Sequence, residues 1–432
     1  MRRVVVTGMG LITPLGCSVE TNWKKLISGQ SGIKLISHFN IEDLPSKIAG
    51  IVPDSTIDEY FAEKDKRKMD NFILFALIAS DEAIENSGYV PKNELESSRT
   101  GVIIGSGIGG LSTIYNNSIL LNSSNPRKVS PFFIPSSLIN LASGQVSIKY
   151  NFRGPNHSIV TACSSGAHAI GDSFKLIQSN KADVMVAGGT EAAVCRLGVA
   201  GFSALRALST KFNDHPEKAS RPFDQKRDGF VMGDGAGVVV LEDYEFAKKR
   251  NAKIYAEIIG YGSSGDGHHI TSPPLDGNGA KRCIESAVKD ADINLEKIDY
   301  INAHGTSTPI GDKIEIECIK KIFSKNLKKI KMSSTKSAIG HLLGASGSVE
   351  AIYSICTINN NQIPPTLNLN DPIEESAGID LVPNNSIDHK ISCILSNSFG
   401  YYVFGFIAGD TFFITSIRMD IVDVLFLLCS CC

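Results

Sequence analysis

The sequence predicts an α/β protein whose strands are buried and mostly parallel. Short β-branched runs bounded by glycine recur along the chain, and stretches with helical spacing of apolar residues separate them. The chain has 432 residues, 42% of them hydrophobic and 20% charged, which suffices for a large core. This alternation of strand and helix is typical of sheets whose faces are covered by helices.

The first element is expected to be a strand over residues 2–6, followed by a glycine-rich turn. The opening MRRVVVTGMGLITPLG places two arginines before an apolar run, as a secretory signal does. Gly8, Gly10 and Pro14 interrupt that run, however, and no typical cleavage site follows. A buried strand explains the segment better than a signal peptide.

The clearest helix is expected over residues 67–88, where apolar side chains form a stripe, Asp70 lies early and Gly88 closes the run. Other strands, each a β-branched run next to glycine, are expected at residues 100–105, 182–189, 236–243 and 297–305. A strand and glycine-rich turn similar to the opening recur at residues 255–267. Two similar halves are therefore expected to meet near residue 252.

Charge, cysteine spacing and hydropathy argue against several classes of protein. The net charge of −2 gives no reason to expect a nucleic-acid-binding protein. The ten cysteines lack the spacing of a metal site or a disulfide framework, so reduced thiols and a cytoplasmic location are expected. No apolar stretch reaches the about 18 residues of a membrane span; the last dozen residues come nearest, beside Asp420 and Asp423.

One cysteine lies in a segment of small residues, TACSSGAHAI, over residues 161–170. The surrounding sequence predicts a strand at 157–161, a tight turn, and a helix from about 164 to 179. A thiol at the start of a helix meets unpaired N–H groups that favour the thiolate, so Cys163 is a candidate nucleophile. From this segment alone, a small buried core residue remains an equal alternative.

Two histidines are expected near strand-to-helix transitions. His304 follows a strand and precedes Thr306 and Thr308, while His341 begins a helix rich in small residues, after Lys336. Open α/β sheets present catalytic groups at such transitions. Neutral imidazoles there can donate hydrogen bonds to a developing oxyanion, so a thiolate with two such donors suits acyl transfer.

Six motifs together resemble the β-ketoacyl-[acyl-carrier-protein] synthases of the elongating, type II kind. In order they are VTGMGLITPLG, GSGIGG, TACSSG, RPFDQKRDGFVMGDGAG, NAHGTSTPIGD and KSAIGHLLGASGSVE, and the resemblance runs from residue 3 to about 400. It implies a thiolase-type fold of two pseudo-equivalent halves in five layers, α/β/α/β/α, and a homodimer. Residues 1–252 would carry the nucleophile, residues 253–400 the catalytic histidines, and residues 401–432 an atypical tail.

The resemblance also implies a reaction, the elongation of fatty acids by two carbons. Cys163 would accept an acyl group from acyl carrier protein, and malonyl-loaded carrier protein would then be decarboxylated and condensed with it. His304 and His341 would stabilise the enolate. Lys336 would support the electrostatics, with Glu315 as its ion-pair partner.

Further positions match substrate-binding residues of that family. Thr306 and Thr308 match a pair that binds the pantetheine arm, and Ile108 and Phe202 match the acyl pocket. Phe399 and Tyr401 lie in the loop that closes on the substrate.

Two more groups of residues carry over from the resemblance. The resemblance implies no required cofactor. Asn302, Glu350, Ser396 and Asn397 match a monovalent-cation site found in some relatives, although hydrogen bonding alone would explain these residues equally. A basic rim that docks the acidic carrier protein would comprise Arg67, Lys68, Arg127, Lys128 and Arg206.

The chain departs from the family pattern after Gly400. Tyr401 stands where the family has a gating phenylalanine, and Tyr402 and Val403 replace two glycines. Bulky residues adopt left-handed backbone only at a cost in free energy, so the loop that closes on the substrate should move poorly and impaired condensation is expected. A shifted reading frame would produce such a tail. Two alternatives stay open: a relative that only binds carrier protein or decarboxylates malonyl groups, and a coenzyme A thiolase, for which Cys393 is the candidate second cysteine.

Overall fold

Strands from both halves of the chain join into one mixed sheet, which counts twelve strands within the described residues. The computed structural model describes residues 1–268, 274–400, 411–419 and 422–431. The first half supplies β1 (Val4–Thr13), β2 (Gly16–Cys17), β5 (Thr100–Gly105), β6 (Asn156–His157), β7 (Val184–Glu191) and β8 (Gly235–Asp243). The second supplies β9 (Ala256–Gly262), β10 (Tyr300–Asn302), β11 (Lys331–Ser333), β14 (Cys393–Phe399), β15 (Thr411–Met419) and β16 (Val422–Cys431).

Several element boundaries follow the local signals in the sequence. The helix expected over 67–88 is α4 (Asn71–Ser87); it begins after Asp70, whose side chain accepts a hydrogen bond from the Phe72 N–H. It ends at Gly88, which adopts left-handed backbone at φ 61°. The strands expected at 157–161 and 297–305 are shorter, at two and three residues in β6 and β10.

The expectation of mostly parallel strands is only partly confirmed. β5 pairs in parallel with β6 and β7, and β10 pairs in parallel with β11 and β14. The central strand β1 instead pairs antiparallel with both β8 and β9, and β7 pairs antiparallel with β8. A strand that is buried on both faces has the same apolar sequence in either direction, so its composition did not reveal this.

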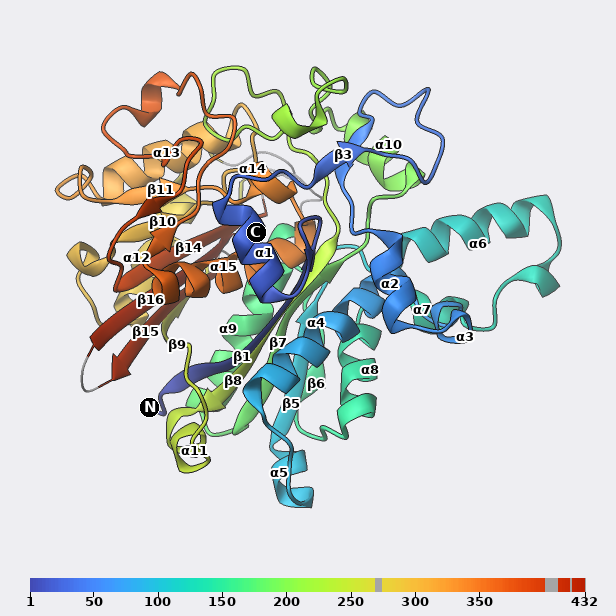
Figure 1. Cartoon of the computed structure of the whole chain (residues 1–432), viewed down its shortest axis with the longest axis horizontal. Coiled ribbons are helices and arrows are strands. Elements are labelled where there is room, and N and C mark those ends of the chain that lie inside the picture. The colour runs from blue at the N-terminus through green and yellow to red at the C-terminus, as the bar shows by residue number, and fades with distance from the viewer. Residues whose placement is uncertain (269–273, 401–410, 420–421, 432) are drawn as a thin grey trace.

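Helices and sheet form five layers in the order α/β/α/β/α (Figure 1). On the outside of the first half, α4 and α8 (Leu141–Tyr150) pack on β1, β5 and β8. Between the two halves, α9 (Ser165–Gln178) packs on β7 while α15 (Ser346–Asn360) packs on both β8 and β14. On the outside of the second half, α12 (Asn278–Asp290) packs on β9 and on α13 (Gly311–Ile322).

The central pair of helices positions the candidate site. α9 and α15 contact each other, and their N-terminal ends are preceded by the short turns η2 (Ala162–Ser164) and η5 (Leu343–Ala345), which also touch. Segments from both halves therefore meet at one point between the layers. Among the described helices, none combines the length and the apolar character needed to cross a lipid bilayer.

Candidate active site

Cys163 lies in the turn η2, directly before helix α9, and only 3% of its surface is exposed. Ala162, just before it, adopts left-handed backbone at φ 49°, which is costly for a residue with a Cβ. The Ser165 hydroxyl donates to the Ala162 carbonyl at 2.7 Å and accepts from the Thr161 N–H at 2.9 Å. These bonds hold the strained turn and fix the direction of the thiol.

His341 contacts the thiol directly. Its Nε2 lies 2.9 Å from the Cys163 Sγ, and its Nδ1 lies 2.8 Å from the Ser346 hydroxyl. If Ser346 donates to Nδ1, the Nε2 carries the proton and points at sulfur; this tautomer is assigned from the partners. His341 does not begin a long helix as expected, since η5 separates it from α15 at Ser346.

His304 completes a pair of imidazoles. Its ring lies perpendicular to that of His341, with centroids 5.3 Å apart, and 5.4 Å from the Phe399 ring. The Lys336 Nζ donates to the His304 carbonyl at 2.6 Å and lies 3.5 Å from its Nδ1. A cation beside Nδ1 favours the tautomer in which the His304 Nε2 carries the proton.

Both histidines are neutral. Burial lowers the pKa of His304 and of His341 well below the ordinary value, and the Lys336 cation lowers both further. Each ring can therefore donate one N–H without bringing a positive charge into the site. Such preorganised neutral donors can stabilise charge that develops on a thioester oxygen.

The expected pairing of Lys336 with Glu315 is wrong. The Lys336 ammonium pairs with Glu350, and both side chains are 1% exposed. Glu315 accepts instead from the backbone N–H groups of His304 and Gly305, at 2.9 and 2.8 Å, and from the Asn397 amide at 2.9 Å. Its position near the start of α13 directs the carboxylate at the loop that carries His304, so it holds that loop.

The expected substrate residues lie around the thiol and the histidines. Phe202 belongs to the buried apolar cluster that contains Cys163, and the partly buried Ile108 packs against this cluster. The Thr306 and Thr308 hydroxyls lie 3.1 Å apart on the loop after His304. Phe399 closes one side of the His304 ring. Tyr401 lies outside the described residues.

The four residues expected to hold a cation share one feature: each has a buried side-chain oxygen without a hydrogen-bond partner among the described residues. They are the Asn302 Oδ1, the Glu350 Oε2, the Ser396 Oγ and the Asn397 Oδ1. Buried polar atoms are almost always paired, and hard monovalent cations bind such oxygens. The donor set therefore fits a cation.

The five expected docking cations, Arg67, Lys68, Arg127, Lys128 and Arg206, are all exposed. Lys68 pairs with Asp65 at 3.2 Å, whereas no ion pair within the described part of the chain holds the other four. They lie in or beside three short elements: α3 (Glu63–Lys66), η1 (Pro126–Lys128) and the end of α10 (Arg196–Ala204).

The sequence did not identify Ser346 or Glu191 as parts of the site. The Ser346 hydroxyl lies 2.8 Å from the His341 Nδ1, and Glu191 bonds to loops on both sides of the thiol. A carboxylate that ends an otherwise apolar strand could have signalled Glu191, because Glu is rarely buried without partners.

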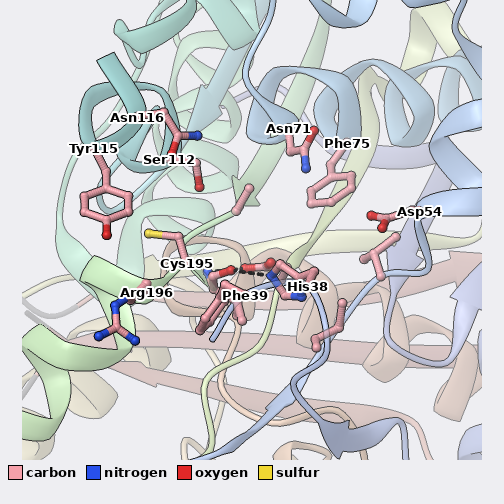
Figure 2. A pocket seen from close by; sticks show the side chains of 15 residues that line it. His38, Phe39, Asp54, Asn71, Phe75, Ser112, Tyr115, Asn116, Cys195 and Arg196 are labelled. Atoms are coloured by element: carbon pink, nitrogen blue, oxygen red, sulfur yellow. Dashed lines mark hydrogen bonds between the residues drawn. The ribbon is translucent and has the colours of Figure 1, made fainter. Parts of the chain in front are cut away.

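A cavity of about 300 Å³ lies beside the loop between β7 and α10 (Figure 2). Cys195, Tyr115 and Arg196 line it, and none of the predicted catalytic residues does. Burial raises the pKa of the Cys195 thiol, so this cysteine lacks the features of a nucleophile.

Cys393 does not lie at the site either. Cys393 is the first residue of β14, and Phe399, the last residue of this strand, contacts the His304 ring. The length of the strand, about 20 Å, therefore separates Cys393 from His304. Burial also raises the pKa of Cys393 well above the ordinary value. The placement gives no support to a second catalytic cysteine of the thiolase kind.

His168 is a buried histidine of α9 that yields a testable pH dependence. Its Nδ1 lies 2.5 Å from the Thr161 hydroxyl, and burial lowers its pKa from 6.5 to about 3. Below pH 6.5 the His168 imidazole binds a proton in the unfolded chain but not in the folded chain. The free energy of unfolding therefore decreases as the pH falls.

We expect His168→Asn to remove this dependence. When the pH is lowered from 7 to 5, the free energy of unfolding of the wild type should fall by about 2 kcal/mol more than that of the variant. Urea unfolding at both pH values measures it. A constant difference between the two proteins would contradict a neutral, buried His168.

Two family profiles match the chain. Residues 1–247 match the family described as Beta-ketoacyl synthase, N-terminal domain, and residues 255–370 match Beta-ketoacyl synthase, C-terminal domain.

Individual relatives match most of the chain. The 3-oxoacyl-[acyl-carrier-protein] synthase 2 of Rhizobium meliloti (strain 1021) is 54% identical over 408 residues, or 93% of this chain and 96% of that protein. The protein of the same name from Coxiella burnetii (strain RSA 493 / Nine Mile phase I) is 51% identical over 400 residues, with the same shares. A solved ketosynthase, described as bound to a hexaketide and in complex with its type II PKS acyl-carrier protein, has a TM-score of 0.87 at 32% identity, covering 96% of this chain and 99% of that chain.

Proposed function

This chain belongs to the beta-ketoacyl synthase family, and from that premise we propose that it elongates fatty acyl chains by two carbons. The substrates are an acyl thioester and a malonyl thioester, both carried by acyl carrier protein. The observation that carries the proposal is the contact between Cys163 and a neutral His341, with a second neutral imidazole, His304, beside it.

In the first step Cys163 takes the acyl group. The thiolate attacks the carbonyl carbon of the acyl thioester, the new C–S bond forms, and the carrier's thiolate leaves and takes up a proton. The N-terminal end of α9 favours the negative charge on the Cys163 sulfur. The apolar cluster with Ile108 and Phe202 receives the acyl chain.

In the second step the malonyl thioester loses carbon dioxide. The electron pair of the broken C–C bond moves into the thioester, and the oxygen that gains charge accepts hydrogen bonds from the Nε2–H groups of His304 and His341. The carbanion then attacks the acyl carbon on Cys163, a C–C bond forms, and the Cys163 thiolate leaves. Release of carbon dioxide from malonyl carrier protein by the purified protein tests this step.

Positioning groups keep the imidazoles in place. Lys336, paired with Glu350, holds the His304 carbonyl and keeps its ring neutral, and Glu315 binds the two N–H groups of the same loop. The residues of the nucleophile lie in the first half, 1–252, and the histidines lie in the second, 253–400. The tail, 401–432, adds β15 and β16 beside β14.

A monovalent cation completes the second half in this proposal. Asn302, Glu350, Ser396 and Asn397 would hold it through the oxygens that lack other partners. When bound, it supplies a fixed positive charge that satisfies buried oxygens next to the Lys336–Glu350 pair.

Removing monovalent metal ions is therefore expected to lower the unfolding temperature by about 2 °C or more, and added potassium or sodium should restore it. Ser396→Ala should weaken this response, because it removes one of the oxygens. Ser173→Ala, which removes a similarly unpartnered hydroxyl from α9, should leave the response intact. An unfolding temperature that is independent of these ions in the wild type would contradict the site.

The exposed basic residues would dock the carrier protein. We expect the double variant Arg67→Glu, Lys68→Glu to lose roughly tenfold in kcat/KM for carrier-bound substrate at low salt, with a flatter salt dependence. A small thioester substrate should react as before. Lys248→Glu with Lys249→Glu is the control, because it changes the net charge equally on α11 (Tyr244–Lys249), away from α3 (Figure 1). Equal losses on both substrates would contradict docking.

We also propose a homodimer in a reducing cytoplasm. β6 ends the sheet at an edge, and large exposed apolar side chains lie on the segment between β5 and β6, within residues 111–150. They are Ile114, Ile119, Leu121, Phe132, Ile134, Leu138 and Ile148. Such a surface favours a partner copy. No disulfide joins the seven cysteines in the part of the chain with described side chains, as expected in a reducing compartment.

A further inference from the structure

We infer that Glu191 is a positioning residue whose carboxylate fixes two segments against Cys163: the loop that carries Ile108 and the turn that follows His341. The inference rests on the proposed function for the meaning of Ile108 as an acyl-pocket residue. Glu191 is the last residue of β7 and has no exposed surface.

The carboxylate joins the two segments through four hydrogen bonds. Its Oε1 accepts from the Ser106 hydroxyl at 2.7 Å and from the Ile108 N–H at 3.1 Å. Its Oε2 accepts from the Gly107 N–H at 2.7 Å and from the Gly344 N–H at 2.9 Å. One oxygen therefore serves the acyl-pocket loop alone, while the other bridges that loop to the turn after His341.

Backbones pack closely around this carboxylate. A Cβ atom on Gly344 would lie 2.3 Å from the Gly107 nitrogen and 2.8 Å from the Glu191 Oε2. A Cβ atom on Gly166, in the first turn of α9, would lie 2.9 Å from the Gly344 carbonyl oxygen. The nucleophile's helix, the acyl-pocket loop and the histidine's turn thus meet where Glu191 binds.

Two strained residues flank the junction. Leu343 has φ 46° directly before Gly344, and Ala162 has φ 49° directly before Cys163. Residues with a Cβ stay in this region only when neighbouring contacts hold them. The bond from Gly344 to Glu191 supplies such a contact for the turn that keeps His341 in place.

The neighbouring Asp234 differs from Glu191 in what it holds. Its Oδ1 accepts from the Val194 N–H at 3.0 Å, whereas the N–H groups of Gly107, Ile108 and Gly344 all donate to Glu191. Burial raises the pKa of Asp234 well above the ordinary value, and the nearby Glu191 raises it further. Asp234→Asn is therefore a matched control: a buried acid of the same strand-end region, replaced by a neutral side chain of the same shape.

The two oxygens predict different outcomes for different substitutions. In Glu191→Gln we expect the amide NH₂ group to take the place of Oε1 and the amide oxygen to take the place of Oε2. The Ser106 hydroxyl can turn to accept a hydrogen bond from the NH₂ group. The two partners of Oε2 are backbone N–H groups, which can only donate. Only the Ile108 N–H then loses its acceptor. In Glu191→Ala the bond to Gly344 is lost as well, so the His341 turn is released from this anchor.

Two measurements on the full-length protein separate these effects. Alkylation of Cys163 by iodoacetamide, followed by peptide mass spectrometry, reports on the thiol and His341 and needs no acyl substrate. Acylation by hexanoyl and dodecanoyl carrier protein reports on the pocket. We expect Glu191→Gln to change the ratio of the two acylation rates about fivefold while alkylation stays within about twofold of wild type.

Glu191→Ala should change the acylation ratio and also slow alkylation about tenfold, and Asp234→Asn should change neither by more than about twofold. A wild-type acylation ratio in Glu191→Gln, or equal effects of Asp234→Asn, would overturn the inference. If Glu191→Ala does not fold, the Glu191→Gln ratio decides. If the wild type accepts no acyl group, the proposed function fails, and alkylation of Glu191→Ala at the wild-type rate would then separately overturn the positioning role.

Discussion

Cys163→Ser is expected to abolish covalent acylation and to lower the condensation rate by a factor on the order of 10⁶, the scale of losing an acyl-transfer nucleophile. The sulfur is the atom that must form the thioester, and the His341 Nε2 lies 2.9 Å from it. A serine hydroxyl keeps the volume but is far less ionised. Peptide mass spectrometry after incubation with acyl carrier protein measures the added acyl mass.

Cys195→Ser is the matched control for this prediction. Cys195 is also a buried cysteine at the start of a helix, where its sulfur accepts from the Gly198 N–H at 3.4 Å. Serine is a favourable residue at that position, so the fold should persist. Acyl mass on the peptide of Cys195, or acylation that survives in Cys163→Ser, would refute the assignment of the nucleophile.

The histidine variants should show the next largest effects. His304→Ala and His341→Ala should each raise the barrier for malonyl decarboxylation by roughly 2.7–4 kcal/mol, the effect of removing one oxyanion donor. Acylation of Cys163 should survive in His304→Ala, because the His341 Nε2 still lies beside the sulfur. In His341→Ala acylation should slow as well, since the N–H that faces the sulfur is gone.

Substitution by asparagine separates hydrogen bonding from packing. An amide N–H can replace an imidazole donor, so His341→Asn should recover part of the decarboxylation rate that His341→Ala loses. His168→Asn, a buried histidine of α9 that bonds to Thr161, serves as the control and should decarboxylate at nearly the wild-type rate. If His304→Ala lost acylation but kept decarboxylation, the proposed roles would be wrong.

The sequence predicted the ends of a helix or strand well where residues at those ends determine them. The cap at Asp70 and the left-handed Gly88 bound α4 almost where the sequence places them, because each acts on its own turn of helix. The strand at 100–105 agrees with β5 residue for residue. The gathering of Cys163, His304 and His341 followed from motif resemblance, since no local signal links residues so far apart in the chain.

Contacts between distant segments could not be predicted in the same way. Lys336 could pair with either of two glutamates, and only the packing of α15 against the His304 loop selects Glu350 over Glu315. The antiparallel pairing of β1 with β8 leaves no trace in their apolar sequences. The four bonds of Glu191 likewise depend on loops that are brought together by the tertiary fold.

A two-step experiment on the purified wild-type protein tests the central claim most directly. Cys163 is first loaded with an acyl group from acyl carrier protein, excess donor is removed, and malonyl carrier protein is added. The account predicts that the acyl mass leaves the Cys163 peptide while carbon dioxide is released and a β-ketoacyl carrier protein, two carbons longer, appears in equal amount. Carbon dioxide released without loss of the acyl group from Cys163, or no acyl group on Cys163 at all, would contradict it.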